Sequence, residues 1–205
     1  MKREILNLEQ GTPEWFAVRM GCVTASEFHT VMAAGKAGAP SKTRRAYMLK
    51  LIGERLTQEP QESYCNVHME RGKVMEAEAR ELYELVSGLT VEQVGFIKAG
   101  DDIGCSPDGM VGADGLQEIK TKLPHLQLEV LLRDEVPAEH MGQCQGALWV
   151  AEREWIDFVS YWPKLPIFIK RVYRDTDYIA KIRSEVDAFL NEMAETTILI
   201  EKIRG

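Results

Sequence analysis

The sequence predicts an α/β (α+β) fold in which helices flank a mixed central β-sheet. Two patterns indicate this class. Apolar residues recur at helical spacing over about residues 43–56, 69–86 and 177–198. Shorter apolar runs, punctuated by glycine and proline, lie within residues 90–121 and 155–173, as expected for strands. The order is therefore helices, a mainly antiparallel meander, then a helix, two strands and a last helix, which is typical of a layered mixed fold.

Capping signals and spacing predict the first three helices. Thr24-Ala25-Ser26-Glu27 fits a capping box, so we expect a helix from about residue 25 to residue 34. A loop should follow, then a helix over about 43–56 and a third over about 69–86 that ends near Gly88. The side chains expected to face the core are Tyr47, Leu51 and Ile52 in the second helix and Met75, Ala79, Leu82, Tyr83 and Val86 in the third.

The rest of the chain is predicted to be mainly strands with two helices. The strands are expected over about 90–97, 103–106, 109–111, 116–121, 155–162 and 167–173. One helix should include 142–150. The last should span about 177–198, with an apolar face made of Ile179, Ile182, Val186, Phe189, Leu190 and Met193. Because no linker, repeat or low-complexity segment interrupts the chain, we expect one domain over residues 1–205.

Composition narrows the class of function. A net charge of −7 and a pI near 5.3 argue against a non-specific nucleic-acid coat, but not against an enzyme that confines positive charge to a channel. Four scattered cysteines without a CxxC pair predict free thiols and no zinc site. The N-terminus lacks the apolar stretch of a signal peptide and no run is long enough to span a membrane, so we expect a cytoplasmic protein.

One segment near the middle of the chain carries the strongest chemical signal. Pro107-Asp108 is followed by nine residues and then by Glu118-Ile119-Lys120. Side chains alternate along a strand, so Glu118 and Lys120 should project to one side. Glycines between the two motifs predict a hairpin that returns Asp108 opposite Glu118. Two carboxylates beside an amine suit a hard divalent cation and the activation of water; the alternative is a surface hairpin with a solvated Glu–Lys pair.

Three polar positions on the predicted helices are weaker candidates. Glu76 lies at the apolar edge of its helix, where a carboxylate is costly unless it is paired or near a metal, and a salt bridge to Arg80 is the simpler alternative. Gln143 and Gln145 are two residues apart, so they do not share a helical face and at most one should reach a site.

A phosphate pocket is predicted near the start of the chain. Arg19 can offer two parallel N–H groups to a phosphate. Ser26 should lie in the first turn of the predicted helix, where backbone N–H groups and the helix dipole favour an anion. The alternatives are a surface arginine and an ordinary serine at a helix start.

Together, five ordered blocks resemble the lambda-exonuclease and YqaJ-like viral recombinase family of the PD-(D/E)xK nuclease superfamily. The blocks are Trp15…Arg19-x-Gly21…Thr24-Ala25-Ser26, Arg71-Gly72-Lys73-x-x-Glu76, Ser106-Pro107-Asp108-Gly109, Glu118-x-Lys120 and Gln143-x-Gln145…Trp149-Val150. The resemblance extends over about residues 7–195. It is much more specific than the short Asp108…Glu118-x-Lys120 pattern alone.

The resemblance implies a restriction-endonuclease-like core and a metal site. Asp108, Glu118 and the backbone carbonyl of Ile119 would bind Mg²⁺, with two ions expected and Mn²⁺ able to substitute. Glu76 would complete the site directly or through water. Lys120 would orient or deprotonate the attacking water.

Further roles follow from the same resemblance. Of the two amides, Gln145 would be the supporting one. The residues that would hold a 5′-terminal phosphate are Arg19, Ser26 and Ser106, with Thr24 beside them.

The activity implied by the resemblance is 5′→3′ digestion of one strand from double-stranded DNA ends, with a preference for a 5′-phosphate. The products would be mononucleotides and a 3′ single-stranded overhang. A ring-shaped homotrimer would encircle the DNA, and a single-strand annealing protein would receive the overhang. The setting would be the cytoplasm of a bacterial host, with the gene carried by a phage or prophage.

Two alternatives and two departures accompany this prediction. The alternatives are a PD-(D/E)xK endonuclease and a DNA-end-binding module that does not cut. The chain is short near its N-terminus and over 35–41, so this loop and 64–69 should differ where they face DNA. Met69 is the candidate for a residue that wedges the strands apart.

Overall fold

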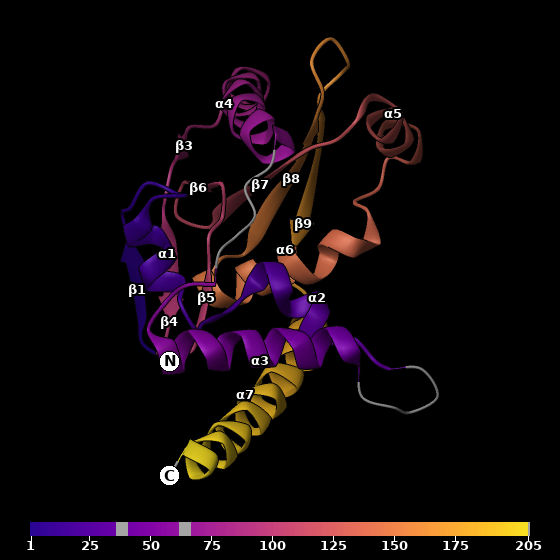
Figure 1. The fold of residues 1–205 in the computed structure, drawn as a ribbon. Coiled ribbons are helices and arrows are strands. Elements are labelled where there is room, and N and C mark those ends of the chain that lie inside the picture. Colours follow the sequence, from indigo (N-terminus) through magenta and orange to yellow (C-terminus); the bar gives the residue numbers. More distant parts are fainter. Residues whose placement is uncertain (36–40, 62–66, 205) are drawn as a thin grey trace.

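The computed structural model describes residues 1–35, 41–61 and 67–204, with the backbone alone for 67–71, 73 and 204. Within these ranges, helices pack on two mixed β-sheets (Figure 1). The helices are α1 (Pro13–Arg19), the 3₁₀ turn η1 (Ala25–Glu27), α2 (Phe28–Val31), α3 (Lys42–Thr57), α4 (Val67–Ser87), α5 (Pro124–Arg133), α6 (Ala138–Ala151) and α7 (Thr176–Arg204). The strands are β1 (Arg3–Leu6), β2 (Val23–Thr24), β3 (Val91–Glu92), β4 (Phe96–Ala99), β5 (Ile103–Cys105), β6 (Gly109–Val111), β7 (Gly115–Thr121), β8 (Trp155–Tyr161) and β9 (Phe168–Tyr173).

The strands form two sheets that interleave along the chain, because β3 of sheet B precedes β4 and β5 of sheet A. Sheet A has the order β1-β4-β5-β2 and sheet B has the order β3-β6-β7-β8-β9. In each sheet one pair is parallel, β2 with β5 and β7 with β8, and the other pairs are antiparallel. The parallel β7–β8 pair requires a long crossover, which α5 and α6 provide. Only three residues, 106–108, connect β5 of sheet A to β6 of sheet B.

Sheet B is covered on both faces (Figure 1). On one face, Ala79 and Tyr83 of α4 pack with Ile119 of β7 and Val159 of β8. On the other face, α6 packs against apolar side chains of β7 and β8 within the main core. Because side chains alternate along a strand, β7 sends Ile119 toward α4 and sends Glu118 and Lys120 the other way.

Helix α6 fits closely against η1 and α2. A Cβ atom on Gly146 would lie 2.3 Å from the ring of Phe28, so only glycine permits this approach. The segment from Cys144 to Val150 is buried throughout. This packing fixes the rotation of α6 and therefore decides which of its polar side chains reach the hairpin.

Most predicted elements are confirmed. Sheet B is the predicted mixed sheet flanked by helices, and the helices expected over 43–56, 69–86, 142–150 and 177–198 correspond to α3, α4, α6 and α7. The predicted core faces of α3 and α7 are buried or partly buried. In the part of the chain that the structure describes, no helix is both long and apolar enough to cross a membrane.

Several expectations were wrong. The capping box does not form, because the Thr24 side chain bonds the Ser26 hydroxyl instead of a backbone N–H, and the expected ten-residue helix is only η1 followed by α2. Val86 is 59% exposed, although its helical angle continues the stripe of Ala79 and Tyr83. The strand expected over 90–97 is split, with β3 in sheet B and β4 in sheet A. Sheet A as a separate sheet, α1 and α5 were not predicted.

Candidate active site

The β6–β7 hairpin places Asp108 opposite Glu118, as the sequence predicts. Gly109 pairs with Gln117 in the sheet register, and one residue earlier the Asp108 backbone N–H donates to the Gln117 carbonyl at 3.1 Å. The Asp108 side chain then turns back onto β7, where its Oδ2 accepts a hydrogen bond from the Ile119 backbone N–H at 2.5 Å. The hairpin therefore fixes the separation of the two carboxylates through backbone bonds.

Glu118 and Lys120 project to the same side of β7, which confirms the alternation argument. The Lys120 ammonium lies 2.6 Å from Glu118 Oε1, and the Glu118 side chain is only 3% exposed. Burial lowers the pKa of Lys120, but the charges of Glu118 and Asp108 outweigh it, and the net effect raises that pKa. In this arrangement Lys120 is held as a cation beside the carboxylates.

Three carboxylates converge here, and we call Glu76, Asp108 and Glu118 the carboxylate cluster. Burial raises the pKa of Asp108 well above its usual value, and the charges of Glu118 and Glu76 add to this effect. Burial likewise raises the pKa of Glu76, against the opposing effect of Arg80. Negative charge is thus concentrated where the protein itself supplies too little positive charge to balance it.

The carboxylate cluster fits a hard divalent cation. Asp108 Oδ1 and Glu118 Oε2 accept none of the hydrogen bonds that hold the two side chains in place. Among the described residues, no group of three carboxylate, imidazole or thiol side chains is placed to hold a metal ion by itself. Mg²⁺ suits such an open site, because it commonly takes one or two protein carboxylates and fills its other positions with water and substrate phosphate.

Of the two roles considered for Glu76, the salt bridge is present and the role as a metal ligand stays a prediction. Arg80 Nη2 lies 2.7 Å from Glu76 Oε1, so the expected salt bridge within α4 is present. The charges of Glu118 and Lys120 also act on Glu76, which places it beside the hairpin. Its side chain is 33% exposed, so one carboxylate can be paired on one side and face the cavity on the other.

A second group, the arginine pocket (Trp15, Arg19 and Ser106), lies beside the carboxylate cluster. Arg19 Nη1 donates to the Ser106 hydroxyl at 2.7 Å, and the Trp15 indole N–H donates to that hydroxyl at 3.2 Å. The Arg19 guanidinium stacks 4.0 Å from the centre of the Trp15 ring. No carboxylate pairs with Arg19 among the described residues. Burial lowers the Arg19 pKa, as expected for a cation without a counter-charge.

Helix α3 anchors the turn that follows Arg19. Gly21 has a φ of +68°, and its N–H donates to the buried carboxylate of Glu54 at 2.9 Å. Its carbonyl accepts from the Arg55 guanidinium, which also pairs with Asp102. A Cβ atom at Gly21 would lie 2.5 Å from the Arg55 side chain, so glycine is required for both the φ angle and the contact.

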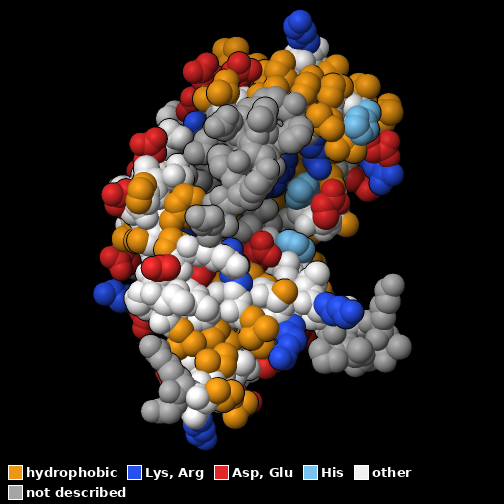
Figure 2. All heavy atoms as spheres, viewed as in Figure 1, with side chains coloured by type: hydrophobic (Ala, Val, Ile, Leu, Met, Phe, Trp, Pro, Cys, Tyr) orange, Lys and Arg blue, Asp and Glu red, His pale blue; other side chains and the backbone are white. Residues whose placement is uncertain are grey.

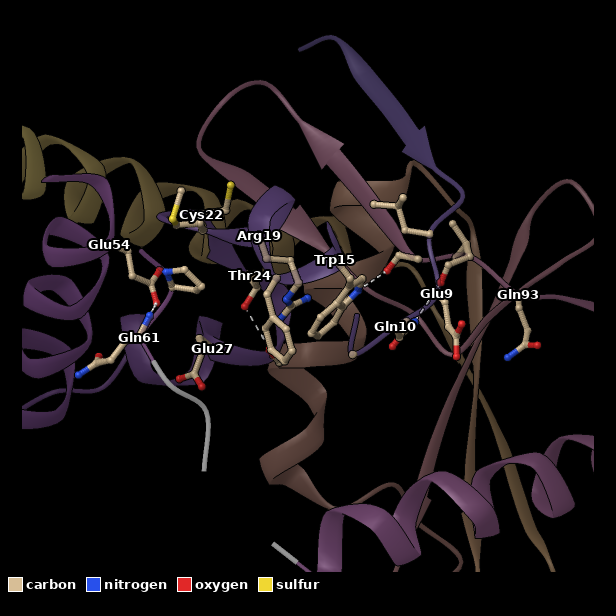
Figure 3. A pocket seen from close by; sticks show the side chains of 18 of the residues that line it. Glu9, Gln10, Trp15, Arg19, Cys22, Thr24, Glu27, Glu54, Gln61 and Gln93 are labelled. Carbon is tan, nitrogen blue, oxygen red and sulfur yellow. Dashed lines mark hydrogen bonds between the residues drawn. The ribbon is translucent and has the colours of Figure 1, made fainter. Parts of the chain in front are cut away.

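Three of the four predicted phosphate-binding residues, Arg19, Thr24 and Ser26, line one cavity of about 1100 Å³. Arg19 and Thr24 lie along its wall (Figure 3), and Ser26 and Glu76 also line the cavity. The Thr24 and Ser26 hydroxyls are 3.1 Å apart. The helix-dipole argument for Ser26 was wrong, because α2 is only a four-residue helix. On the face shown in Figure 2 the molecule is hollowed, and Lys, Arg and His side chains gather beside the hollow.

The structure corrects the choice between the two amides of α6. Gln145 is buried away from the cluster, where its Nε2 donates to the Tyr173 carbonyl and its Oε1 accepts from the Asp175 N–H, both at 2.9 Å. Gln143 Nε2 instead donates to Glu118 Oε1. The sequence contained one indication that Gln145 would not reach the carboxylate cluster. Gln145 lies inside an apolar run, where a buried amide commonly bonds backbone groups.

Part of the predicted site lies outside the described residues. The proposed wedge residue Met69, the segment 64–66 and the side chains of Arg71 and Lys73 fall there, as do residues 36–40 of the loop expected to differ. The Cys22, Cys105 and Cys144 thiols are free and buried, as the cysteine spacing predicts.

Comparison with known proteins decides the family. Residues 14–154 match the YqaJ-like viral recombinase domain. This chain belongs to the YqaJ-like viral recombinase family. Its fold matches the crystal structure of an alkaline exonuclease (LHK-Exo) from Laribacter hongkongensis, with a TM-score of 0.84, 36% identity, and coverage of 94% of this chain and 98% of that one. The complex of LHK-Exo with dAMP matches equally well.

A more distant solved structure supports the fold assignment but not the activity. A phage-related exonuclease from Haemophilus somnus 129PT matches with a TM-score of 0.65 at 17% identity, covering 89% of this chain and 96% of that one. No curated protein sequence matches. Membership of the YqaJ-like family and the likeness to LHK-Exo identify the chain as a nuclease with the restriction-endonuclease-like fold.

Proposed function

We propose that this chain is a Mg²⁺-dependent exonuclease that digests one strand of duplex DNA from a 5′-phosphorylated end. The observation that carries the proposal is the adjacency of two groups. The carboxylate cluster and Lys120 suit phosphodiester hydrolysis, and the arginine pocket offers an unpaired cation to a phosphate. Ser106 of the pocket is two residues from Asp108 of the cluster, so the backbones that carry the two groups are at most about 7 Å apart.

In the proposed reaction, each side chain has a role that its contacts support. Asp108 and Glu118 would hold Mg²⁺ through their free oxygens, with the Ile119 carbonyl as a further ligand and Glu76 at the edge. Bound Mg²⁺ would lower the pKa of a water and offset charge on the leaving oxygen, and Mn²⁺ has similar ligand preferences. Lys120, already held against Glu118, would orient the water and stabilise the phosphorane.

The arginine pocket would select the DNA end. Arg19 and Ser106 can bind the terminal 5′-phosphate through charge-assisted hydrogen bonds, and Thr24 and Ser26 can add hydroxyl donors from the same cavity wall. Holding the terminal phosphate would place the first phosphodiester at the carboxylate cluster. Digestion would then run 5′→3′ and release mononucleotides, leaving a 3′ single-stranded overhang.

The cellular role in this proposal is recombination. The match to a viral recombinase domain supports a phage or prophage function in the bacterial cytoplasm, where a single-strand annealing protein would take up the overhang. A homotrimer that encircles DNA would make digestion processive. Light scattering tests this last point, since a mass near three chains is expected and a monomer would contradict the ring.

The decisive experiment compares DNA ends. Linear duplex with a 5′-phosphate at one end and a 5′-hydroxyl at the other is incubated with Mg²⁺, beside the same duplex as a closed circle. We expect loss of the strand that begins with the phosphate, with the circle intact, and no loss with the Asp108→Asn variant. Cutting of the circle would instead indicate an endonuclease, and binding without any cutting would indicate an end-binding module.

A further inference from the structure

A second lysine follows the catalytic candidate on the same face of sheet B. The Lys122 backbone N–H donates to the Tyr161 carbonyl at 3.2 Å, so the pairing of β7 with β8 continues past the end of the strand. Alternation therefore puts Lys122 on the side of Glu118 and Lys120. Its ammonium confirms this placement, because it lies 3.0 Å from Nε2 of His140 on α6.

The charge of Lys122 is poorly compensated. Its side chain is 14% exposed, and the carboxylate that approaches it is Glu139, at 3.7 Å with a side chain 66% exposed. An exposed pair at that distance contributes little. His140 offers no negative charge. Burial, Lys122 and Lys120 together lower the pKa of His140 to about 4, so it is a neutral acceptor at pH 7.

This arrangement resembles the arginine pocket more than an ordinary ion pair. A buried cation is costly unless it is paired or meets an anionic ligand. His140 holds the ammonium in position by accepting one of its three N–H groups, and the ring of His140 is in turn stacked on Phe158 at 5.2 Å. A second N–H group of Lys122 approaches the exposed carboxylate of Glu139, and the ammonium lies on the side of the hairpin that carries Lys120.

We propose that Lys122, positioned by His140, binds the phosphodiester that follows the scissile one on the 3′ side of the digested strand. This inference rests on the proposed function, which assigns the scissile phosphodiester to Lys120 and the terminal phosphate to Arg19. Two residues of strand advance the chain by roughly 6.6 Å, which is comparable with the separation of neighbouring phosphates along a nucleic-acid strand. Because the 5′ neighbour is already held by Arg19, the 3′ neighbour remains for Lys122.

The experiment removes the negative charge of the phosphodiester and the positive charge of Lys122, first separately and then together. Duplexes carry a neutral methylphosphonate in place of the phosphodiester between the second and third nucleotides, or at a site far from the end. Initial rates of release of the first nucleotide, before the modified linkage becomes the scissile one, are compared for the wild type, Lys122→Gln, Lys122→Arg and Lys202→Gln, a control at the exposed far end of α7 (Figure 1). Thermal melting verifies that each variant is folded.

We expect the effects of the variant and of the methylphosphonate to be non-additive. The methylphosphonate near the end should slow the wild type and Lys202→Gln about tenfold, but it should slow Lys122→Gln little further. It should slow Lys122→Arg as much as the wild type, because arginine keeps the charge. In an Asp108→Asn background, which prevents cleavage, Lys122→Gln should also reduce the slope of log K against log salt for duplex binding by about one.

Each contrary outcome has a distinct meaning. Independent effects of the variant and the methylphosphonate, or an unchanged salt slope, would overturn the role of Lys122 while digestion by the wild type still supports the proposed function. No digestion of any duplex by the wild type would overturn the proposed function itself. Inhibition by free dAMP separates the two sources of phosphate. If Lys122→Gln weakens dAMP inhibition as much as duplex binding, the site holds the mononucleotide and the proposal is wrong.

Discussion

The carboxylate cluster and the arginine pocket have opposite electrostatic imbalances although Pro107 alone separates Ser106 from Asp108. In the carboxylate cluster, burial raises the pKa values of Asp108 and Glu76, and the crowding of three acids adds to this effect. In the arginine pocket, a partly buried guanidinium meets a hydroxyl and an aromatic ring, and no carboxylate of the described residues pairs with it. Had stability alone shaped this region, Arg19 could have been paired with one of those acids.

The difference indicates that each group is complemented by something outside the chain. Carboxylates without enough positive charge favour a bound cation, and a buried arginine without an acid favours an anion. A metal-bound DNA end supplies both, since it brings cations to one group and a phosphate to the other. Four measurements test this electrostatic difference between the carboxylate cluster and the arginine pocket.

The largest effect is expected from Asp108→Asn, which should reduce cleavage at least about 1000-fold, because a metal ligand is lost. The same change should raise the melting temperature of the metal-free protein at pH 8. The folded-state pKa of Asp108 lies above its unfolded value, so the wild type loses stability as the pH rises through the folded pKa, and asparagine removes that loss.

Turnover and thermal melting at pH 8 and at pH 5 check this prediction. Asp187→Asn, on the exposed side of α7, is the matched control and should change neither. A lower melting temperature for Asp108→Asn at pH 8 would show that the crowding of carboxylates does not cost stability.

Arg19→Ala should slow digestion of 5′-phosphorylated ends roughly 10- to 100-fold, the range for loss of charge-assisted hydrogen bonds to a phosphate. Digestion from 5′-hydroxyl ends should change little. Arg19→Lys retains charge but not the planar stack on Trp15, so an intermediate loss is expected. Equal slowing on both kinds of end would contradict a pocket for the terminal phosphate.

The two amides of α6 should separate catalysis from stability. Gln143→Ala removes a bond to Glu118 and should lower turnover about tenfold with little change in melting. Gln145→Ala removes the buried amide that bonds the partly buried Tyr173 carbonyl and Asp175 N–H, which should cost about 1–3 kcal/mol of unfolding free energy and little turnover. Steady-state kinetics and denaturant unfolding of both variants test this, and the reverse pattern would restore Gln145 as the supporting residue.

The smallest effect is the response of stability to Mg²⁺. Saturating Mg²⁺ should stabilise the wild type by about 1–3 kcal/mol, as expected for a ligand at 10 to 100 times its dissociation constant. Arg19→Ala should keep this response and Glu118→Gln should lose it, because only the carboxylate cluster is expected to bind the ion. A response that survives Glu118→Gln would place the metal elsewhere.

The sequence predicted the parts of this site that depend on local geometry. Asp108, Glu118 and Lys120 lie as expected because strand alternation and a short hairpin determine their positions. The choice between Gln143 and Gln145 failed because it depends on the rotation of α6, which the contact of Gly146 with Phe28 sets.

Long-range packing explains the other errors. The turn after Arg19 depends on hydrogen bonds that Gly21 makes with Glu54 and Arg55 of α3, which are more than thirty residues away. No local sequence pattern predicts these hydrogen bonds. Similarly, Thr24 could have capped a helix, but its hydroxyl bonds Ser26 in a segment that α6 holds in place. Local propensity was overridden by packing in both cases.

The short connection between β5 and β6 has a consequence for protein engineering. Ser106 serves one group and Asp108 the other, so an insertion or deletion between them would displace both at once. Changes of end preference are therefore best sought from α1, where Trp15 and Arg19 approach Ser106 without touching the hairpin. Libraries randomised at that helix could yield variants that start on other 5′ termini while the cutting machinery stays intact.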